Sequence, residues 1–516
     1  MTPTETTLLF EDPSGIATPM LAVFAVDLAP GEDAEPLIAL MTTSSGVSNA
    51  ARKVLGSGEF KAGLGETLLL HAPEGIRAER LLIVGMGKVR RLTTDAVRKA
   101  AGVAVRSAKP RGLRQLTIAL PEDHALDDEA LESLPVSLTT RAVVEGAVLA
   151  NPEWDTYKSD RKDRTLTTLQ LVAPATERAT HAEIRRGHAE GLIVANAQNT
   201  ARSLVNEPGN VLTPTELGLR ATEMCLRNGL KCEVHSTELM QQLGMNAFLA
   251  VARGSSQPPA LIVMRYEPQD APADGPVLGL VGKGITFDTG GISLKPADGM
   301  EKMKYDMAGA AAMIGAMQAI AQLKPRVRVT AIVCSTENMP DGNAYKPGDV
   351  VQAMSGKTIE IINTDCEGRM VLADGLHYAR TLGCTHLINA ATLTGACVVA
   401  LGMVNAGAFS NDETTWQRFD QALRVSGEKF WRLPCTDDYR DLIKSPIADI
   451  RNQGIGRWGG ATTAAMFLKE FVGDTPWVHL DIAGCAWNEE NKAWLPTGPT
   501  GIAVRSIVEW VRSYAV

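Results

Sequence analysis

Short apolar runs alternate with longer amphipathic segments along the whole chain, and this pattern predicts an α/β protein. Apolar runs of about four to eight residues between turn formers are typical of buried strands, and an apolar repeat of three to four positions is typical of helices. The expected strands are residues 20–27, 66–72, 80–85, 116–121, 169–173, 260–265, 277–281, 327–334, 358–362, 386–390 and 477–482. The expected helices are residues 93–109, 141–151, 181–205, 215–228, 303–323, 369–382 and 461–472. Because the two kinds of element alternate, we expect parallel or mixed sheets covered by helices.

Two domains are expected because 516 residues exceed the size that one hydrophobic core usually supports. Residues 1–183 are predicted to form a smaller N-terminal α/β domain. Residues 206–516 are predicted to form a larger C-terminal domain with a mixed-sheet α/β/α architecture. A helix over residues 184–205 is expected to link them, and it must end at the turn-rich segment NEPGNVLTP, residues 206–214.

Composition and charge favour a globular protein that acts in the cytoplasm. Hydrophobic residues make up 45% of the chain and charged residues 21%, as is usual for soluble domains. The net charge of -8 argues against coating of nucleic acid by bulk charge, although the basic runs 77–91 and 109–114 leave a local DNA-binding patch open. The opening MTPTETTLLF lacks a basic start followed by an apolar core, so no export signal is expected.

A long uncharged run, residues 387–411, is predicted as a buried strand and turn rather than a membrane span. Asn and Gly residues interrupt it, and it lacks the aromatic or basic anchors that usually flank a span. No interaction with membranes is therefore expected.

The cysteines and histidines do not form a recognisable metal motif. The eight cysteines include no C-x-x-C pair, and the eight histidines include no H-E-x-x-H. Reduced thiols are therefore expected rather than disulfides or a zinc-thiolate site. A metal bound to this chain would need mainly oxygen ligands.

Two segments carry a dense set of charged residues directly after expected strands. In IINTDCEGRM the carboxylates of Asp365 and Glu367 stand two residues apart and are followed at once by Gly and Arg. In LVGKGITFDTGGISLK we expect Lys283, Asp288 and Lys295 to emerge from a Gly-rich loop. In open α/β sheets, such positions at the carboxyl ends of strands are where ligands bind.

A fourth acid, Asp306, lies near the start of the expected helix 303–323. Each acid alone is better explained as a helix cap or a solvated turn. Four acids that converge without a cation would raise their own pKa values and destabilise the fold. Two divalent ions about 3.5–4 Å apart, as in two-metal hydrolytic sites, would remove that problem. The set as a whole therefore favours a two-metal hydrolase.

Several motifs make the chain resemble the leucyl aminopeptidases, a family of hexameric dizinc metallopeptidases. NTDCEGR at 363–369 is similar to the family signature N-T-D-A-E-G-R, with Cys366 in place of Ala. The other similar segments are 206–210, 281–295, 304–311, 337–350, 391–396 and 459–467. The resemblance covers roughly residues 190–510 and implies that the C-terminal domain is the catalytic one.

The resemblance implies five metal ligands. The more firmly bound ion would be held by Lys283, Asp288, Asp306 and Glu367, and the readily exchanged ion by Asp288, Asp365 and Glu367. Zinc or manganese is expected, with magnesium or cobalt as alternatives, because the ligands are mostly oxygens. Lys283 would coordinate as a neutral amine, since a nearby dication strongly depresses the pKa of an ammonium group.

Two further residues are implied to act in catalysis without binding metal. Lys295 would stabilise the oxyanion that develops on the substrate carbonyl. Arg369 would hold a bicarbonate that relays a proton from the attacking water to the leaving amine. This role for bicarbonate would explain why the motifs contain no conventional His or Glu base.

The implied substrates are peptides with a free N-terminus, cleaved after Leu or another apolar residue. The resemblance places Met303, Thr392, Leu393 and Gly395 in the substrate cleft, and simple core packing is the alternative for these positions. It also implies a homohexamer built from two stacked trimers. Cys366 is expected to point away from the ligands as a small buried residue.

DNA binding and another kind of two-metal hydrolysis are the alternatives to peptide hydrolysis. Some bacterial members of the family also bind DNA, so an additional DNA-binding or regulatory role of the hexamer is the alternative. A different two-metal hydrolase, such as a phosphatase, would leave Lys283 and Arg369 in the motifs without explanation.

Overall fold

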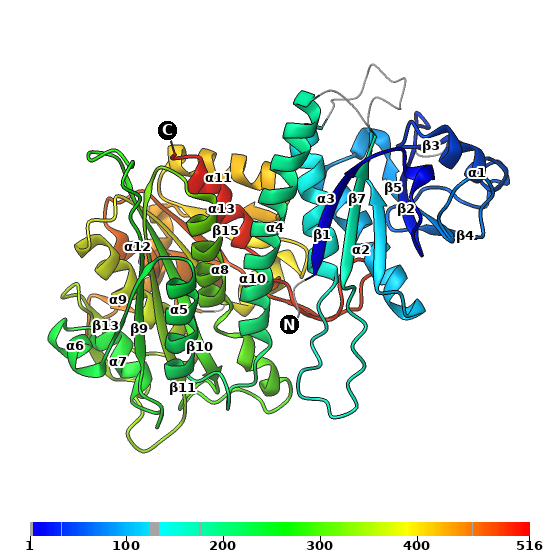
Figure 1. The fold of residues 1–516 in the computed structure, drawn as a ribbon. Helices are drawn as coiled ribbons and strands as arrows, with labels where there is room; N and C mark the ends of the chain where they lie inside the picture. The colour runs from blue at the N-terminus through cyan, green and yellow to red at the C-terminus, as the bar shows by residue number, and fades with distance from the viewer. Residues whose placement is uncertain (1–3, 32–33, 123–133, 175–177, 457, 516) are drawn as a thin grey trace. The chain divides into compact units, whose positions relative to one another are not determined.

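The computed structural model describes residues 4–31, 34–122, 134–174, 178–456 and 458–515, and the chain forms two compact units (Figure 1). The first unit contains residues 1–196 and 489–497, and the second contains residues 197–488 and 498–516. Each unit has its own sheet and its own hydrophobic core. The return of residues 489–497 to the first unit has no counterpart in the sequence pattern.

The first unit is built on a largely parallel sheet, as the alternation of strands and helices predicted. Its strands are β1 (Glu5–Phe10), β2 (Leu21–Asp27), β3 (Ile38–Leu40), β4 (Thr67–His71), β5 (Arg80–Lys88), β6 (Gln115–Ala119) and β7 (Thr168–Ala173). The order is β1-β7-β6-β2-β5-β4 with β3 beside β2, and the β4–β5 and β2–β3 pairs are antiparallel. The helices are α1 (Ser45–Leu55), α2 (Thr94–Ala108) and α3 (Val136–Ala150), and α4 (Arg178–Asn206) continues into the second unit.

Strand β2 and the helix pair α2–α3 contribute much of the core of this unit. The sequence LAVFAVD of β2 is buried along its whole length, as expected for a strand paired on both sides in a covered parallel sheet. Helices α2 and α3 approach closely at Gly146, where a Cβ atom would lie 1.9 Å from the carbonyl oxygen of Arg98. Any side chain at position 146 would therefore force the helices apart.

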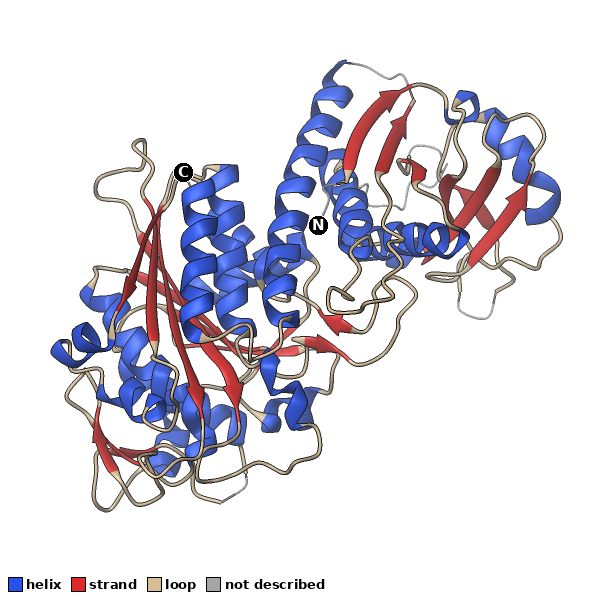
Figure 2. Ribbon diagram, turned by 60° about the horizontal axis from the view of Figure 1, so that its bottom comes forward, coloured by secondary structure: helices blue, strands red, loops and turns tan. Residues whose placement is uncertain are grey.

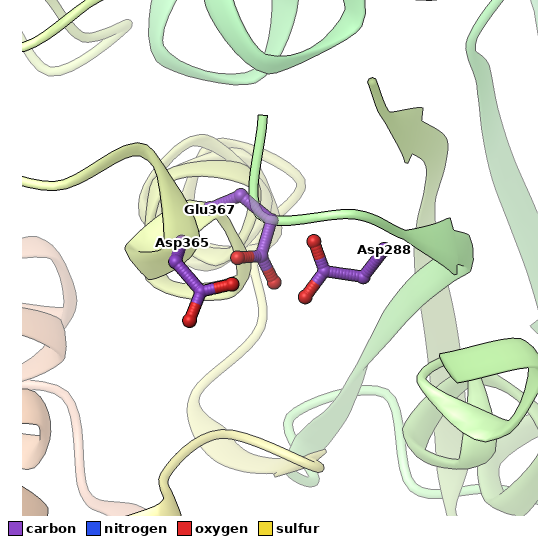
Figure 3. A group of neighbouring side chains, drawn as sticks. All are labelled: Asp288, Asp365 and Glu367. Carbon is purple, nitrogen blue, oxygen red and sulfur yellow. The ribbon is translucent and has the colours of Figure 1, made fainter. Parts of the chain in front are cut away.

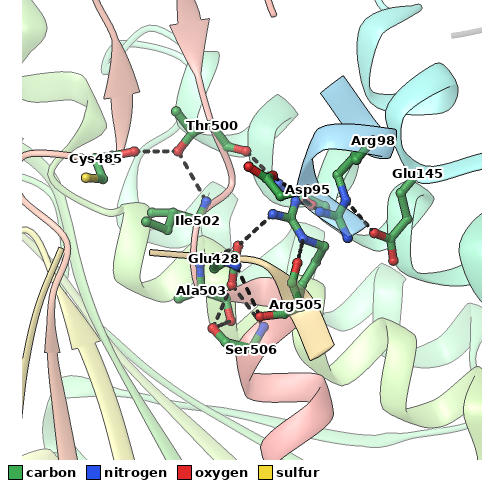
Figure 4. Close-up of polar contacts among 12 residues, drawn as sticks. Asp95, Arg98, Glu145, Glu428, Cys485, Thr500, Ile502, Ala503, Arg505 and Ser506 are labelled. Atoms are coloured by element: carbon green, nitrogen blue, oxygen red, sulfur yellow. Dashed lines mark hydrogen bonds and ion pairs between the residues drawn. The ribbon is translucent and has the colours of Figure 1, made fainter. Parts of the chain in front are cut away.

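A buried ion cluster joins these two helices. Glu145 of α3 is fully buried and accepts hydrogen bonds from Arg98 Nε at 2.8 Å and from Arg141 Nε at 2.7 Å. Asp95 lies 3.4 Å from the NH1 group of Arg98, and Figure 4 shows Asp95, Arg98 and Glu145 together. Opposite charges thus neutralise one another inside the first unit.

The second unit is built on a mixed eight-stranded sheet with helices on both faces (Figure 2). Its strands are β8 (Lys231–His235), β9 (Ala260–Tyr266), β10 (Val277–Asp288), β11 (Arg328–Asn338), β14 (His386–Ala391), β15 (Ala406–Ser410), β16 (Phe430–Arg432) and β18 (Trp477–Asp481). The order is β16-β15-β18-β14-β10-β11-β9-β8, and β10 is parallel to both of its neighbours. The helices are α5 (Pro214–Arg227), α6 (Thr237–Gln242), α7 (Asn246–Ala252), α8 (Ala308–Leu323), α9 (Glu367–Thr381), α10 (Gly395–Leu401), α11 (Glu413–Ser426), α12 (Gly460–Val472) and α13 (Val504–Arg512).

Close contacts at two glycines show which helix covers which face of β10. A Cβ atom at Gly282 would lie 2.7 Å from Ala310 Cα, which belongs to α8. A Cβ atom at Gly375 of α9 would lie 3.2 Å from Cγ1 of Val281. Since neighbouring residues of a strand point to opposite faces, Lys283 shares the α9 face with Val281.

Two small sheets complete the second unit. One contains β12 (Val350–Gln352), β13 (Thr358–Glu360) and β17 (Ile450–Arg451), and the other contains β19 (Trp487–Asn488) and β20 (Gly498–Pro499). The strand before IINTDCEGRM therefore belongs to a side sheet, because β13 pairs with β12 and β17. The predicted strand 358–362 is present as β13, but the motif that follows it does not lie at the end of a main-sheet strand.

The uncharged run 387–411 contains the predicted buried strand, β14, but it continues into the partly exposed helix α10 and a second strand, β15, which were not predicted. Within the described part of the chain, no helix combines the length and the apolar character needed to cross a membrane.

Glu428 holds the N-terminus of α13. Its carboxylate accepts from the N–H groups of Ala503 at 3.1 Å and Ser506 at 2.9 Å, and from the Ser506 hydroxyl at 2.6 Å (Figure 4). A negative charge is favoured at this end of a helix. These bonds also hold Ala503 at a φ of +77°, in the left-handed region that alanine rarely adopts.

Candidate active site

Strand β10 carries two of the predicted site residues. Lys283 lies within the strand and Asp288 is its last residue, so the expectation that both emerge from a loop is wrong. Pairing with β11 extends the strand through the glycines that suggested a loop. The loop begins after Asp288, and at its Gly290 φ is +86° and a Cβ atom would lie 2.8 Å from Asp365 Oδ1. Glycine therefore lets this loop pass directly beside Asp365.

The segment NTDCEGR forms a 3-10 turn over residues 364–366 that runs into α9. Helix α9 begins at Glu367, two residues earlier than the predicted start at 369, and the helix dipole favours a carboxylate there. Gly368 leaves no room for a side chain, because a Cβ atom would lie 2.6 Å from Lys283 Cε. The order acid, Gly, Arg thus reflects the packing of this helix start against one buried lysine.

Three of the four predicted acids converge at one point. Asp288, Asp365 and Glu367 each offer an oxygen, and these three oxygens lie within 4.8 Å of one another. Figure 3 shows Asp288 at the end of its strand, facing the two acids of the turn and helix. Asp288 and Glu367 are buried and Asp365 is partly exposed, so the cluster lies at the edge of the interior.

The fourth acid, Asp306, is connected to this cluster through Lys283. The helix predicted from 303 begins as a 3-10 turn, η5 (Met300–Tyr305), and Asp306 lies between η5 and α8. The Lys283 ammonium lies 2.8 Å from Asp306 Oδ1 and 2.7 Å from Glu367 Oε1. Thr392 donates its hydroxyl to the same Asp306 oxygen at 2.7 Å, and its carbonyl accepts from Lys283 at 2.9 Å.

Lys295 lies on the more open side of the cluster. Its ammonium is 2.8 Å from Asp288 Oδ2 and 2.5 Å from Asp365 Oδ1. Its side chain is 22% exposed, whereas that of Lys283 is 3% exposed. Lys295 is therefore the lysine that an incoming molecule could reach.

The pKa values of three acids in the cluster lie above their usual range. Burial raises the pKa of Glu367 to about 8 and that of Asp306 to about 6, and it also raises the pKa of Asp365. Burial lowers the pKa of Lys283 and of Lys295, but the surrounding carboxylates outweigh burial and hold both pKa values above the usual range.

The donor set fits divalent cations. When every group is ionised, four carboxylates face two ammonium groups, which leaves two negative charges in excess. The buried Oδ2 of Asp306 and Oε2 of Glu367 have no hydrogen-bond partner among the described residues, and such oxygens are costly unless something binds them. Carboxylate oxygens are ligands that zinc, manganese and magnesium accept.

Asn452 holds the 3-10 turn of the NTDCEGR segment, residues 364–366, in place. This buried side chain donates to the carbonyl of Asn363 at 2.7 Å and accepts from the N–H of Ile362 at 2.8 Å. Its own backbone carbonyl accepts from NH1 of Arg369 at 2.6 Å. Sequence reasoning missed Asn452, which lies outside every motif that was recognised.

Asn338 was missed as well, although it lies in the recognised segment ENMPDGNAYKPGDV. It is buried and donates to Asp288 Oδ1 at 2.8 Å and to the carbonyl of Thr364 at 3.1 Å. The hydroxyl of Tyr345 donates to the same carbonyl at 2.8 Å. The motif thus joins the end of β10 to the turn that carries Asp365.

The predicted substrate residues fall on two segments. Thr392 and Leu393 belong to the connection between β14 and α10, and Gly395 is the first residue of α10. Asp481, fully buried at the end of β18, accepts from the N–H of Leu393 at 3.2 Å and so fixes this connection. Met303 lies on η5 and is partly buried. Their role in substrate binding stays a prediction.

The main sheet is mixed, and its central strand ends at a cluster of carboxylates with too few counter-charges. This combination indicates an α/β metallohydrolase. Models of the cytosol aminopeptidase family match two parts of the chain, the catalytic domain over residues 199–508 and the N-terminal domain over residues 24–161. The chain belongs to the cytosol aminopeptidase family and is a metal-dependent aminopeptidase, as its motifs predicted.

Relatives and solved structures match along nearly the whole chain. A probable cytosol aminopeptidase of Acidobacterium capsulatum is 58% identical over 517 residues, covering 99% of this chain and 100% of the relative. Another, of Koribacter versatilis, is 56% identical over 510 residues, covering 98% of each. A mutant of tomato leucine aminopeptidase superposes with a TM-score of 0.85 at 32% identity, covering 99% of this chain and 97% of that one. The bottromycin maturation enzyme BotP in complex with Mn gives 0.82 at 35% identity, covering 97% and 100%.

Proposed function

We propose that this aminopeptidase holds two divalent ions in the acid cluster and preferentially removes N-terminal Leu and other apolar residues from peptides. The observation that carries the proposal is the meeting of three carboxylate oxygens within 4.8 Å, next to buried acid oxygens that have no hydrogen-bond partner among the described residues. The manganese in the related BotP structure supports a divalent ion of this kind.

The proposed ligands of one ion are Lys283, Asp288, Asp306 and Glu367, and those of the other are Asp288, Asp365 and Glu367. Zinc or manganese would suit these ligands, with magnesium or cobalt as alternatives. Such ions would polarise the substrate carbonyl and activate water. Lys283 would then serve as a neutral amine, giving up the proton that it shares with Asp306 and Glu367.

Lys295 and Arg369 are the proposed catalytic residues that bind no metal. The partly exposed Lys295 ammonium can donate a hydrogen bond to the substrate oxygen as negative charge develops. Arg369 is anchored through NH1 on Asn452, and its buried Nε has no hydrogen-bond partner within the described residues. Its planar fork suits a bicarbonate, which would pass a proton between water and the leaving amine.

The substrate pocket and the assembly are proposed from the family. Thr392, Leu393 and Gly395 would line the substrate cleft, and Met303 would belong to the hydrophobic pocket for the first side chain. The free α-amine of the peptide would contact the ion cluster, which would restrict cleavage to N-terminal residues. We further propose a cytoplasmic homohexamer of two trimers, which native mass measurement would test.

Removal and return of metal test the proposed ion cluster. Dialysis against a chelator should abolish cleavage of leucine p-nitroanilide, and zinc or manganese should restore it with about two ions bound per chain by elemental analysis. A phosphoester substrate serves as the control and should not be cleaved in either state. Full turnover by protein shown to be metal-free would overturn the proposal.

A further inference from the structure

We propose that Cys225 and Cys232 form a redox site outside the active site, which closes to a reversible disulfide when hydrogen peroxide oxidises Cys232. Cys225 lies near the end of α5 and is fully buried, whereas Cys232 is the second residue of β8 and is partly exposed. An oxidant can therefore reach the thiol of Cys232, whereas the thiol of Cys225 is shielded from solvent.

The turn between α5 and β8 brings the two thiols together. Gly229, at a φ of +69°, reverses the chain, and the N–H of Leu230 donates to the carbonyl of Cys225 at 2.9 Å. The strand therefore starts directly against the end of the helix, which brings Cys232 back toward Cys225. Thr222 lies three residues before Cys225 on the same helix face, with its hydroxyl oxygen 3.6 Å from Cys232 Sγ.

The environment assigns different chemical roles to the two thiols. A hydrogen bond from Cys225, aided by Thr222, lowers the pKa of Cys232 to about 7. The same hydrogen bond, together with burial, raises the pKa of Cys225 well above its usual range. Because the thiolate is the form that attacks peroxide, Cys232 is the first to react, and Cys225 is the resolving thiol.

The chemistry balances with hydrogen peroxide as the only oxidant. The Cys232 thiolate attacks one peroxide oxygen and breaks the O–O bond, which gives a sulfenic acid and hydroxide. The Cys225 sulfur then attacks the Cys232 sulfur, an S–S bond forms, and the sulfenic hydroxyl leaves as water with the Cys225 proton. Together the two thiols lose two electrons and two protons, and the peroxide becomes two waters. A dithiol reductant reverses the step by thiol–disulfide exchange.

The cross-link would fasten an edge of the main sheet. β8 is the last strand in the sheet order and, among the described strands, pairs only with β9. Edge strands are prone to fraying and to pairing with other chains. A disulfide from β8 to α5 would hold that edge against its covering helix.

Peptide mapping of the full-length protein tests the site without any mutation. Trypsin cleaves after Arg227 and after Lys231, so Cys225 and Cys232 fall in separate peptides, residues 221–227 and 232–253. After brief exposure to hydrogen peroxide and blocking of free thiols, we expect these peptides to appear as one linked species. Treatment with dithiothreitol should release both. Absence of the linked species while Cys232 becomes sulfinic acid would overturn the proposal.

Variants separate the two roles and provide a control. Cys225→Ser should leave a sulfenic acid at Cys232 that dimedone traps, and Cys232→Ser should abolish the linked species. Cys435 is also partly exposed, but burial raises its pKa to about 11, so Cys435→Ser should form the link like the unmodified protein. At pH 7.5 we expect Cys232 to be alkylated roughly tenfold or more faster than Cys435. Equal rates would contradict the assignment of Cys232 as the reactive thiol.

Discussion

The two units bury charge in opposite ways. In the first unit, Glu145 accepts from two guanidinium groups, those of Arg98 and Arg141, at 2.8 and 2.7 Å. In the second unit, the acid cluster contains Asp306 and Glu367, each of which keeps a buried oxygen that has no hydrogen-bond partner within the described part of the chain. Arginines of the chain neutralise Glu145, whereas the acid cluster has only two ammonium groups for four carboxylates.

This difference separates buried charge that supports the fold from buried charge that prepares a site. Taking ions out of water carries a desolvation penalty that only close partners offset. The chain supplies those partners to Glu145, so nothing further needs to bind there. In the acid cluster the ionised side chains leave two negative charges uncompensated, which the proposed divalent ions would offset.

Glu367→Gln should give the largest effect on activity. The change keeps the shape of the side chain but removes a charge from two proposed ligand sets. Loss of a residue that merely orients a ligand costs about 10–100-fold, so we expect kcat/KM to fall by more than about 100-fold. The unfolding temperature of metal-free protein should not fall, because the variant removes an acid whose pKa burial has raised to about 8.

Glu223→Gln is the matched control for this variant. Glu223 lies on α5 and its side chain is 69% exposed, so activity and unfolding temperature should both stay unchanged. If Glu367→Gln kept near-normal activity, or strongly destabilised the metal-free protein, the contrast between the two clusters would fail.

Glu145→Gln should affect stability instead of chemistry. The change leaves Arg98 and Arg141 buried without their shared carboxylate, and breaking a buried ion pair on one side costs about 3–5 kcal/mol. We expect calorimetry to show a clear drop in the unfolding temperature of the first unit. The kcat/KM per folded molecule at 25 °C should equal that of the unmodified protein.

Glu79→Gln provides the comparison for this variant, since Glu79 is exposed and its ion pair with Arg80 lies at the surface. Exposed pairs contribute only about 0–1 kcal/mol, so its unfolding temperature should hardly change. A loss of activity in Glu145→Gln beyond the loss of folded protein would show that the first unit takes part in catalysis.

Local sequence patterns predicted the acids of the site but not the side chains that hold those acids in position. Asp288 and Glu367 lie in motifs that are rich in acidic residues, and this composition already indicated a cation site. By contrast, Asn338 and Asn452 act through contacts with residues 26 to 90 positions away in the chain. Such contacts depend on how distant segments pack, which a local pattern does not contain.

The predicted end of β10 and the sheet assignment of β13 were wrong for the same reason. The glycines in β10 suggest a loop, yet pairing with β11 carries the strand on to Asp288. The predicted strand 358–362 was detected, but its partners β12 and β17 could not be read from its own residues. Strand pairing is a long-range property, and it decided both outcomes.

A third buried carboxylate, Asp374, sharpens the comparison because backbone N–H groups satisfy it. It lies on α9 and accepts from the N–H of Phe248 at 2.9 Å and of Met354 at 2.8 Å. Burial raises the pKa of Asp374 to about 7, although these hydrogen bonds lower it. Hydrogen bonds from neutral donors therefore do not fully offset the effect of burial on this carboxylate.

Asp374→Asn should reveal this through the pH dependence of stability, the smallest of the expected effects. The folded pKa of about 7 lies above the ordinary value of 3.8, so the folded state binds a proton that the unfolded state releases. The stability that this proton contributes is fully present below about pH 4 and is lost as pH rises through 7. Asn does not titrate, so the unfolding free energy of the unmodified protein, relative to the variant, should fall by up to about 1.4 kcal/mol per pH unit between pH 5 and 7.

Urea unfolding of metal-loaded protein at pH 5, 6, 7 and 8 measures this slope, with the exposed Asp270→Asn as the control that should show a constant difference. A constant difference for Asp374→Asn as well would mean that Asp374 is ionised throughout this range. Backbone donors would then suffice to keep a buried carboxylate charged in this protein. The unpaired oxygens of Asp306 and Glu367 would in that case no longer indicate bound cations.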